Sequence, residues 1–538
     1  MQGSGRLVEA LELNPPDQEG ALNRRTGLIF RNVAANYAGT VSILLMAFFL
    51  TPFLVNRLGN LQFGLWAIIG GVMAYGGLLD LGVSTAVVKY VGEHSDLDDV
   101  PGVEKVIHNS LAVYLAIGAA VLVFTGAATL VVPLVFPIPE ELVGTSMILV
   151  AITGGSLAVN FPLGMYNGVL LGLQRHHVVN AADILWGVGT TAGAVIVVGG
   201  GGGLIGLALV YLVGNTLGQM IRIGYLLIKH PEVRWLRVRF DRVTSGKIFS
   251  FSIWAFLLRL ASTLRSRTDE IVVGASLSVA AVTPYFVGLR LGDSLSRLTS
   301  QVSAALFPYG SRLDALEDRE GLRHMYLTAT RSNLAIAMPM ALFLWIQAPR
   351  FIEAWMGPGF EQSTLPARLL ILAVMCHVYV AVGHTFLKSI NRHQAMASWS
   401  MVEVLANLAL SLILVRFYGL AGVAAGTLIP ALAYNLGFVL PHASSRLGAR
   451  VLTVVRQSVV PQVPALTVSA VVMLVAANLP GDPGLFRLIG EAAAAGLTYW
   501  AVYYFLGAGP EERALARRVV GGLMPDRKAP PTQDDRAQ

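Results

Sequence analysis

The sequence has few of the residues that would point to a soluble enzyme. Its 538 residues include one cysteine, Cys376, which excludes an internal disulfide and any metal site built from cysteines. Charged residues make up 13% of the chain, against roughly 25% in a typical soluble domain. No nucleotide-binding motif is present, which argues against an ATP-driven pump. Residues 1–25 lack the apolar core of a cleavable signal peptide.

Long apolar segments make up most of the remaining sequence. About fourteen of them are long enough to cross ~30 Å of hydrocarbon as a helix of roughly 20 residues. The sequence therefore predicts an all-α integral membrane protein. The predicted spans are residues 32–56, 62–86, 109–136, 146–172, 178–199, 204–228, 248–274, 282–308, 332–348, 367–388, 394–415, 420–441, 457–479 and 487–507.

Basic residues alternate between the gaps that separate these spans. Of the 39 Lys and Arg residues, 28 fall in the gaps and tails assigned to one side, and five fall on the other side. By the positive-inside rule, both termini are expected on the cytoplasmic side of a bacterial inner membrane. The remaining six, all arginines, fall inside predicted spans.

An internal repeat predicts two lobes of the same topology. Arg175-His176 recurs as Arg392-His393, 217 residues later, and the glycine-rich start at Gly203 recurs at Gly419. The predicted parts are an N-terminal tail (1–31), a first lobe (32–228), a basic linker (229–247), a second lobe (248–441), two additional helices (457–507) and a C-terminal tail (508–538). An even number of spans separates the copies, so the lobes are expected to be parallel, related by a pseudo-twofold axis along the membrane normal. Residues 1–25 and the tail after Gly509 are expected to be disordered.

Several short motifs resemble one family of transporters. They are Leu50-Thr51-Pro52-Phe53, Phe63-Gly64-Leu65-Trp66, Leu79-Asp80-Leu81-Gly82, Thr268-Asp269-Glu270-Ile271-Val272-Val273-Gly274, Trp355-Met356-Gly357 and Asn391-Arg392-His393. Their order resembles that in polysaccharide-lipid flippases of the Wzx type, in the superfamily that also contains MATE drug exporters and the lipid II flippase MurJ. The resemblance, over roughly residues 25–440, implies two six-helix bundles around a central cavity that opens alternately to each side.

The seventh and eighth predicted spans are unusually polar. They carry Arg259, Arg265, Arg267, Arg290 and Arg297. A lipid-facing arginine at the bilayer centre costs at least ~2.5–3.5 kcal/mol, so these side chains must face protein or water. The same two spans also carry three carboxylates, Asp269, Glu270 and Asp293.

Two interpretations of these arginines remain open. In one, three of the five are neutralised in a buried ion-pair network that holds the helices together. Alternatively, the surplus forms a wet cationic wall, which suits a lipid-linked diphosphate because guanidinium binds phosphate bidentately. Arg265 and Arg267 lie near a helix end, where they could instead snorkel. Substrate binding is therefore expected mainly of Arg259, Arg290 and Arg297.

A second polar stripe follows the tenth predicted span. His377, His384 and Lys388 are spaced by seven and four residues, on one helix face. Asn160 and Asn167 occupy the equivalent positions of the repeat, 217 residues earlier than the two histidines. A polar stripe in both copies fits the wall of a cavity and so a substrate contact, but such residues also serve as hydrogen bonds between membrane helices.

Isolated carboxylates are candidates for binding a coupling cation or proton. Asp183, Glu403 and Asp269 fall inside predicted spans, where carboxylates often have this role. Pairing with Arg222 or with another helix is the alternative for Asp183 and Glu403, and it is the favoured one. Asp80 lies near a helix end, where a helix cap or a contact with Lys89 is expected. No metal site or cofactor is expected.

The resemblance implies a transporter and not an enzyme. The leading hypothesis is a flippase that moves an undecaprenyl-diphosphate-linked oligosaccharide from the cytoplasmic to the outer leaflet for cell-surface polysaccharide synthesis. The expected partners are this lipid and membrane lipids, with a polysaccharide polymerase and chain-length proteins as candidates, and no nucleic acid; the protein is expected to be a monomer. A MATE-type cation or drug antiporter is one alternative, although the first predicted span lacks an acidic residue. A membrane-embedded glycosyltransferase or ligase is another, although no external gap is large enough to fold alone.

Overall fold

The computed structural model describes residues 15–231, 233, 235, 237–390, 392, 394–480, 484–514 and 517. Within these residues the secondary structure is helical, with no strand. Nine segments of this part of the chain are long and apolar enough to cross a membrane. The prediction of an all-α integral membrane protein is therefore confirmed.

The helices follow one another with short connections. The elements of the first half are α2 (Pro15–Gly76), the 3-10 helix η1 (Gly77–Asp80), α3 (Val83–Asp96), α4 (Val100–Val135), α5 (Glu140–Gly172), α6 (His176–Gly199) and α7 (Gly203–Lys229). Those of the second half are α8 (Arg242–Ser276), α9 (Val279–Ala315), α10 (Arg319–Met356), η2 (Glu361–Ser363), α11 (Thr364–Ser389), α12 (Gln394–Leu432), the π-helix η3 (Ala433–Val439), α13 (Leu440–Arg446), α14 (Val451–Ser458), η4 (Val460–Gln462), α15 (Val463–Ala477), α16 (Leu485–Val502) and the π-helix η5 (Tyr503–Gly507).

Short polar side chains start several of these helices. Asp99, Ser278 and Asp318 precede α4, α9 and α10, and each accepts a hydrogen bond from a backbone amide of the first turn. The oxygen of such a residue satisfies an amide that has no partner inside the helix. These residues therefore explain where the long helices begin.

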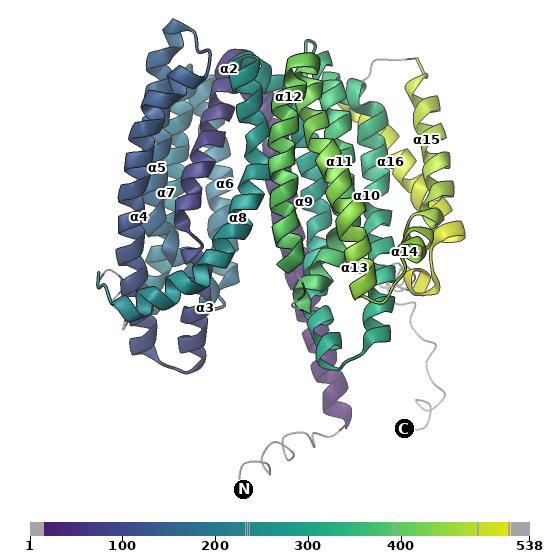
Figure 1. Ribbon diagram of the computed structural model, residues 1–538, viewed down its shortest axis with the longest axis horizontal. Helices are drawn as coiled ribbons and strands as arrows, with labels where there is room; N and C mark the ends of the chain where they lie inside the picture. The colour runs from purple at the N-terminus through teal and green to yellow at the C-terminus, as the bar shows by residue number, and fades with distance from the viewer. Residues whose placement is uncertain are drawn as a thin grey trace, which may run out of the picture.

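Two of the long helices each contain a glycine at which the backbone leaves the helical region. Gly59 in α2 has φ 76° and Gly419 in α12 has φ 56°, a conformation that glycine adopts without a Cβ penalty. Figure 1 shows α2 as two arms that meet at one end of the molecule. Two of the nine candidate segments, Leu44–Asp80 and Ser398–Arg446, include these glycines. α8 and α9 are not among the nine, because their arginines and carboxylates lower their hydropathy.

The predicted span 62–86 is interrupted. The second arm of α2 ends at Gly76, η1 follows, and α3 begins at Val83. Between η1 and α3, Leu81 has φ 49° and Gly82 has φ 79°. A non-glycine residue at positive φ is strained, and such strain is kept only where the surrounding structure fixes it. The interruption places Asp80 inside the bundle, where 4% of this residue is exposed.

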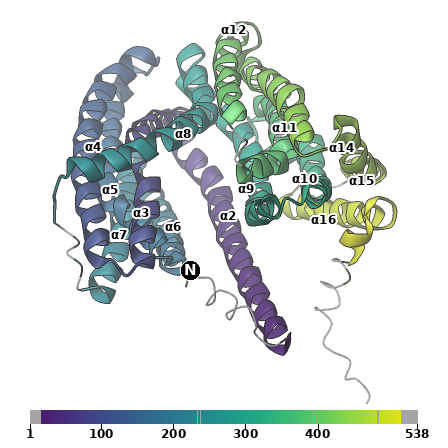
Figure 2. The same cartoon turned by 60° about the horizontal axis from the view of Figure 1, so that its bottom comes forward.

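The helices form two groups with α8 between them. Figure 1 shows α3 to α7 on the left and α9 to α16 on the right. α8 contacts α3 and α4 of the first group as well as α9 and α12 of the second. Figure 2 shows α8 running from the α3 and α4 side toward the second group. The first arm of α2 packs on α9 and α10, since Trp355 donates a hydrogen bond to the Phe48 carbonyl and their rings stack at 5.1 Å.

The second arm of α2 belongs to the first group, because Gly76 packs against Phe124 of α4 and Leu157 of α5. This arm contacts the second group at the end where the two arms of α2 meet, which we call the Gly59 end. Thr283 donates a hydrogen bond to the carbonyl of Asn60 at 2.6 Å. A Cβ on Gly64 would overlap the carbonyl oxygen of Val279. The rings of Phe63 and a facing phenylalanine of α9 lie 5.3 Å apart. Glycine at position 64 therefore permits the backbones of the two groups to approach closely here.

The connection between the halves lies at the opposite end of the bundle and is fixed to the first group. Trp235 is 3% exposed, and its carbonyl accepts a hydrogen bond from the Tyr166 hydroxyl at 2.7 Å. The amide of Asp241 donates to the Asn109 side chain at 2.5 Å. α8 begins at Arg242, inside the predicted linker 229–247. These contacts indicate that the connection is a docked segment of the first group.

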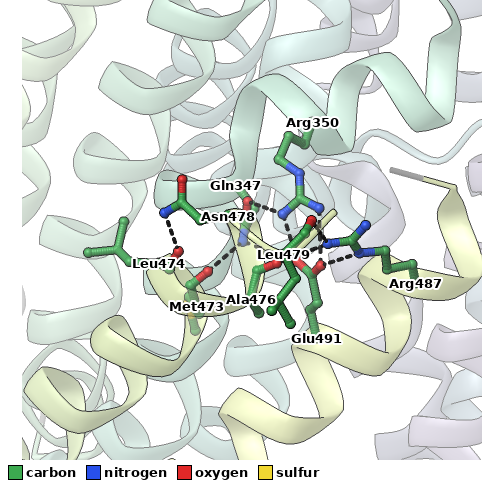
Figure 3. A network of polar contacts seen from close by, with 9 residues as sticks. All are labelled: Gln347, Arg350, Met473, Leu474, Ala476, Asn478, Leu479, Arg487 and Glu491. Atoms are coloured by element: carbon green, nitrogen blue, oxygen red, sulfur yellow. Dashed lines mark hydrogen bonds and ion pairs between the residues drawn. The ribbon is translucent and has the colours of Figure 1, made fainter. Parts of the chain in front are cut away.

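The two additional helices, α15 and α16, are bound to α10 by polar groups. Figure 3 shows Glu491 of α16 between Arg350 and Arg487. Arg350 makes two hydrogen bonds to the carboxylate, at 2.8 and 3.0 Å, and Arg487 makes one at 3.0 Å. Near the other end of α10, Arg331 lies 3.1 Å from Glu512. α10 is therefore joined by ion pairs both to α16 and to the segment that follows it, and the helix pair forms part of the second group.

The ends of the fourth and tenth predicted spans have the same backbone geometry. The amide of Arg175 donates to the Leu170 carbonyl at 2.8 Å, and that of Arg392 donates to Leu387 at the same distance, 217 residues later. The glycine-rich starts also match, with φ 57° at Gly203 and 56° at Gly419.

The segments expected to be disordered are helical in part. α2 begins at Pro15, so residues 15–25 are helical. Residues 510–514 are also helical, and Glu512 accepts a hydrogen bond from the Gly509 amide at 2.9 Å. The glutamate satisfies that amide and pairs with an arginine, which gives this segment partners that composition did not reveal. Residues 1–14 and 518–538 lie outside the described residues.

Candidate functional site

The five arginines of the seventh and eighth predicted spans lie on α8 and α9, in three different surroundings. Arg259 is closest to the first group of helices. Its Nη1 lies 3.8 Å from Oδ2 of Asp80, and 55% of the arginine side chain is exposed. Asp80 also accepts hydrogen bonds from Tyr114 at 2.7 Å and Ser84 at 3.0 Å. We call these four residues the α3 junction.

A second set of residues surrounds Glu403 of α12. Its carboxylate is 2.6 Å from Nη2 of Arg265 and 3.2 Å from Nε2 of His377, and 5% of its side chain is exposed. His384 and Lys388 follow on the same face of α11, and the His384 ring lies 6.2 Å from the Tyr434 ring. Through His377, the predicted stripe on α11 meets Arg265 at the Glu403 carboxylate. We call Arg265, His377, His384, Lys388 and Glu403 the α11 cluster.

The third set contains Arg267 of α8 and the two arginines of α9, Arg290 and Arg297, and the last two line a small cavity. Arg267 lies 3.6 Å from the buried Glu270, and Arg290 lies 3.9 Å from Asp293. Arg290 and Arg297 line a cavity of about 100 Å³ between α9, α10 and the first arm of α2. No ion pair of Arg297 with a described carboxylate is present. This cavity, which we call the arginine pocket, brings together two of the three arginines expected to bind substrate; Arg259 lies elsewhere.

An apolar groove adjoins the arginine pocket. It has a volume of about 470 Å³ and lies between the first arm of α2, α9, α10 and α16. Its walls include Met340, Phe343, Phe351 and Trp500, and it shares Phe48 and two residues of α9 with the arginine pocket. A charged site and a long apolar surface are therefore continuous. An amphipathic molecule with an anionic head and an apolar tail matches this combination.

The three predicted coupling carboxylates differ in their partners. Asp183 is paired with Arg222, which is 7% exposed, and Glu403 belongs to the α11 cluster. Asp269 is 3% exposed and accepts hydrogen bonds from the hydroxyls of Tyr285 at 2.6 Å and Thr427 at 2.8 Å. No ion pair to Asp269 is found in the described part of the chain, and one of its carboxylate oxygens has no hydrogen-bond partner there.

Carboxylates from other helices change the charge balance that the sequence suggested. Arg259 and Arg265 are paired with carboxylates outside α8 and α9. The sequence suggested an excess of positive charge around these two helices, but that inference counted only the carboxylates of the same two spans. It is wrong for the assembled bundle, because carboxylates of other helices pair with two of the arginines. A local excess is present at the arginine pocket, where Arg290 and Arg297 face Asp293.

Asp80 is a site residue whose surroundings the sequence did not predict. The helix cap expected of it is wrong, because Gly82 precedes α3 and no side chain caps this helix. A signal was available in the sequence. Asp80 and Gly82 interrupt an apolar run within three residues, and such pairs mark breaks and turns. The partner on α8 could not have been found in this way, since it depends on tertiary packing.

The chain is similar to known proteins in both sequence and fold. The family model described as "Polysaccharide biosynthesis protein" matches residues 55–365. The relative "Probable flippase AglR" of Haloferax volcanii is 23% identical over 442 residues, which cover 78% of this chain and 82% of the relative. The lipid II flippase MurJ in an inward closed conformation has a TM-score of 0.68 at 15% identity, covering 90% of this chain and 98% of MurJ.

A multidrug resistance MATE family transporter in an inward-facing conformation is also similar. Its TM-score is 0.63 at 14% identity, covering 76% of this chain and 98% of the transporter. These two structural similarities concern the fold. The family match is more specific, because it extends over more than half of the sequence and contains α8, the start of α3 and the arginine pocket residues of α9. This multi-pass membrane protein therefore belongs to the polysaccharide biosynthesis protein family, as its motifs indicated.

Proposed function

We propose that the protein flips an undecaprenyl-diphosphate-linked oligosaccharide from the cytoplasmic to the outer leaflet by alternating access. The observation that carries this proposal is the continuity of the arginine pocket with the apolar groove. The diphosphate binds Arg290 and Arg297, for which bidentate guanidinium contacts are favourable. The groove between α10 and α16 holds part of the polyprenyl chain. The description of AglR as a flippase supports the same activity.

The other polar sets lie along the path of the head group. Arg259 and the α11 cluster, with Arg265, His377, His384 and Lys388, contact the diphosphate and the sugars as the head group moves. Arg267, which is paired with the buried Glu270, is a further candidate for contact with the head group. Among the carboxylates, we assign the coupling cation or proton to Asp269, because it is buried without an arginine partner in the described residues.

Two lobes related by an axis along the membrane normal would provide alternating access. We propose lobes at residues 32–228 and 248–441, followed by the pair at 457–507, and fourteen membrane crossings. The matching backbone hydrogen bonds of Arg175 and Arg392 support this division. In this arrangement the linker and both termini face the cytoplasm of a bacterial inner membrane, as the basic residues indicate.

The alternatives fit the structure less well. A drug antiporter that moves organic cations would have to accommodate them beside Arg290 and Arg297, which repel positive charge. For a glycosyltransferase or ligase, the described residues between α10 and α11 form a short connection with one turn of 3-10 helix, which is too small for an acceptor-binding domain. We therefore infer a transporter that acts as a monomer; a polymerase and chain-length proteins remain candidate partners.

A reconstituted assay tests the proposed function. The purified protein in liposomes should flip a fluorescent undecaprenyl-diphosphate oligosaccharide. Arg290→Ala and Arg297→Ala should each reduce the rate by about 10- to 100-fold, since each removes a charge-assisted contact. Arg312→Ala, which changes an exposed arginine near the end of the same helix, is the matched control. Normal flipping by both pocket variants would exclude this pocket as the diphosphate site.

A further inference from the structure

The α3 junction joins α8 to the first group of helices through a carboxylate that is rigidly held. Asp80 is 4% exposed, and two hydroxyl groups donate hydrogen bonds to it. Its backbone ends the 3-10 turn η1 and is followed by Leu81 at positive φ. Buried hydrogen bonds and an unusual backbone conformation together fix the position of this carboxylate.

The arginine that faces Asp80 is held much less firmly. Arg259 is 55% exposed, and its closest nitrogen is 3.8 Å from the carboxylate, beyond hydrogen-bonding distance. The corresponding distance between Arg265 and Glu403 is 2.6 Å. Exposed ion pairs of this kind are weak, and their partners exchange readily. Arg259 can therefore leave Asp80 for a better anionic partner.

We propose that Asp80 is an internal counter-anion that occupies Arg259 in the empty transporter and is replaced by the diphosphate of the substrate. This inference rests on the proposed function, which supplies a substrate with a diphosphate. A diphosphate offers several oxygens to the guanidinium and can accept the two parallel hydrogen bonds that Asp80 does not receive from Arg259. Asp80 keeps its hydrogen bonds to Tyr114 and Ser84 during the exchange.

The exchange has a mechanical consequence, because α8 contacts both groups of helices. When Arg259 leaves Asp80, one attachment of α8 to the first group is lost, while the attachment of Arg265 to α12 is kept. Asp80 becomes a fixed negative charge near the bound diphosphate and favours its release. It is thus a positioning residue that lowers affinity and accelerates turnover.

The variant Asp80→Asn separates this role from a structural one. The asparagine oxygen can accept the hydrogen bond of Tyr114, and its NH2 group can donate to the Ser84 hydroxyl, which then acts as acceptor, so the unfolding temperature should stay close to that of the wild type. Without the competing charge, the concentration for half-maximal flipping should fall about two- to five-fold, and the maximal rate should fall as well. Asp314→Asn, which removes an exposed charge near the end of α9, is the control. A purely structural Asp80 predicts a lower unfolding temperature with no tighter binding, and that result would overturn the proposal.

Binding of farnesyl diphosphate to the full-length protein in detergent provides a second measurement that does not require flipping. Asp80→Asn should bind this probe about two- to five-fold more tightly than wild type, and Arg259→Gln should abolish the difference. An equal gain in the Arg259→Gln background would refute the exchange, because the effect would not pass through Arg259. Arg259→Lys should bind more weakly than wild type, and equal binding would also count against the proposal. If the wild type binds the probe as described but does not flip the glycolipid, the proposed function fails and the exchange stands.

Discussion

Replacing Gly64 with alanine should open the contact between the two groups of helices at the Gly59 end. A Cβ at this position would overlap the carbonyl oxygen of Val279 and lie 3.0 Å from its carbonyl carbon. The obstacle is backbone, so no side-chain rotation can relieve it. Overpacking of this kind typically costs about 1–3 kcal/mol, and each 1.4 kcal/mol changes an equilibrium tenfold. The closed contact should therefore become about 5- to 150-fold less favourable relative to the open one.

Cysteine labelling measures this shift. A cysteine replaces Phe286, which is 8% exposed and packs against Phe63, in a Cys376→Ser background. Gly64→Ala should raise its modification by a membrane-impermeant maleimide at least fivefold, from the side that the proposed orientation makes external. Gly70→Ala is the control, because a Cβ on Gly70 meets nothing within 4 Å. Equal labelling of all three proteins would show that the close approach of the backbones does not hold this end closed.

Three further changes test other parts of the structure. Glu491→Gln should lower the free energy of unfolding by about 2–3 kcal/mol, because it leaves two partly buried arginines without their carboxylate. Thermal unfolding measures this loss, and Glu353→Gln, which changes an exposed residue of α10, is the control. Trp235→Ala should release the connection between the halves, since truncating a buried tryptophan to alanine costs about 3–5 kcal/mol. The expected result is faster hydrogen exchange across residues 230–241. Unchanged exchange would contradict the docking of this connection on the first group. The amide of Gly102 and then His94 hold the pKa of Asp99 below its usual value of 3.8. The stabilisation by Asp99 is therefore present above pH 3.8, and it is lost as the pH falls through the lower pKa that Asp99 has in the folded protein. Asp99→Asn should lower the unfolding temperature at pH 7. At a pH below both pKa values, where Asp99 is protonated, the variant and the wild type should unfold at the same temperature.

Hydropathy and motif order were sufficient to predict the membrane class and the family. The glycine-rich motif at Gly419 also marked a real change of backbone direction. The interruption after Gly76 was not predicted, because the surrounding residues are apolar enough to read as one continuous helix. A hydropathy window averages over the few residues in which the backbone changes course.

The site was less predictable, because ion pairs in a helical bundle depend on which helices are neighbours. The sequence indicated that Arg265 could not face lipid, and that remains correct. Its actual partner, Glu403, is 138 residues away; pairing of this carboxylate with another helix was foreseen, but not with which one. Periodicity places residues on one face of a helix but does not say which helix covers that face.

The attachment of α16 to α10 has a consequence for how the protein is made. Arg350 is synthesised 141 residues before Glu491, the carboxylate that binds it. During translation, α10 is complete before α16 is made, so Arg350 lacks its carboxylate until the last part of the chain is synthesised. Arg331 of the same helix likewise waits for Glu512. The last residues to be made therefore complete the charge balance of a helix that was made much earlier.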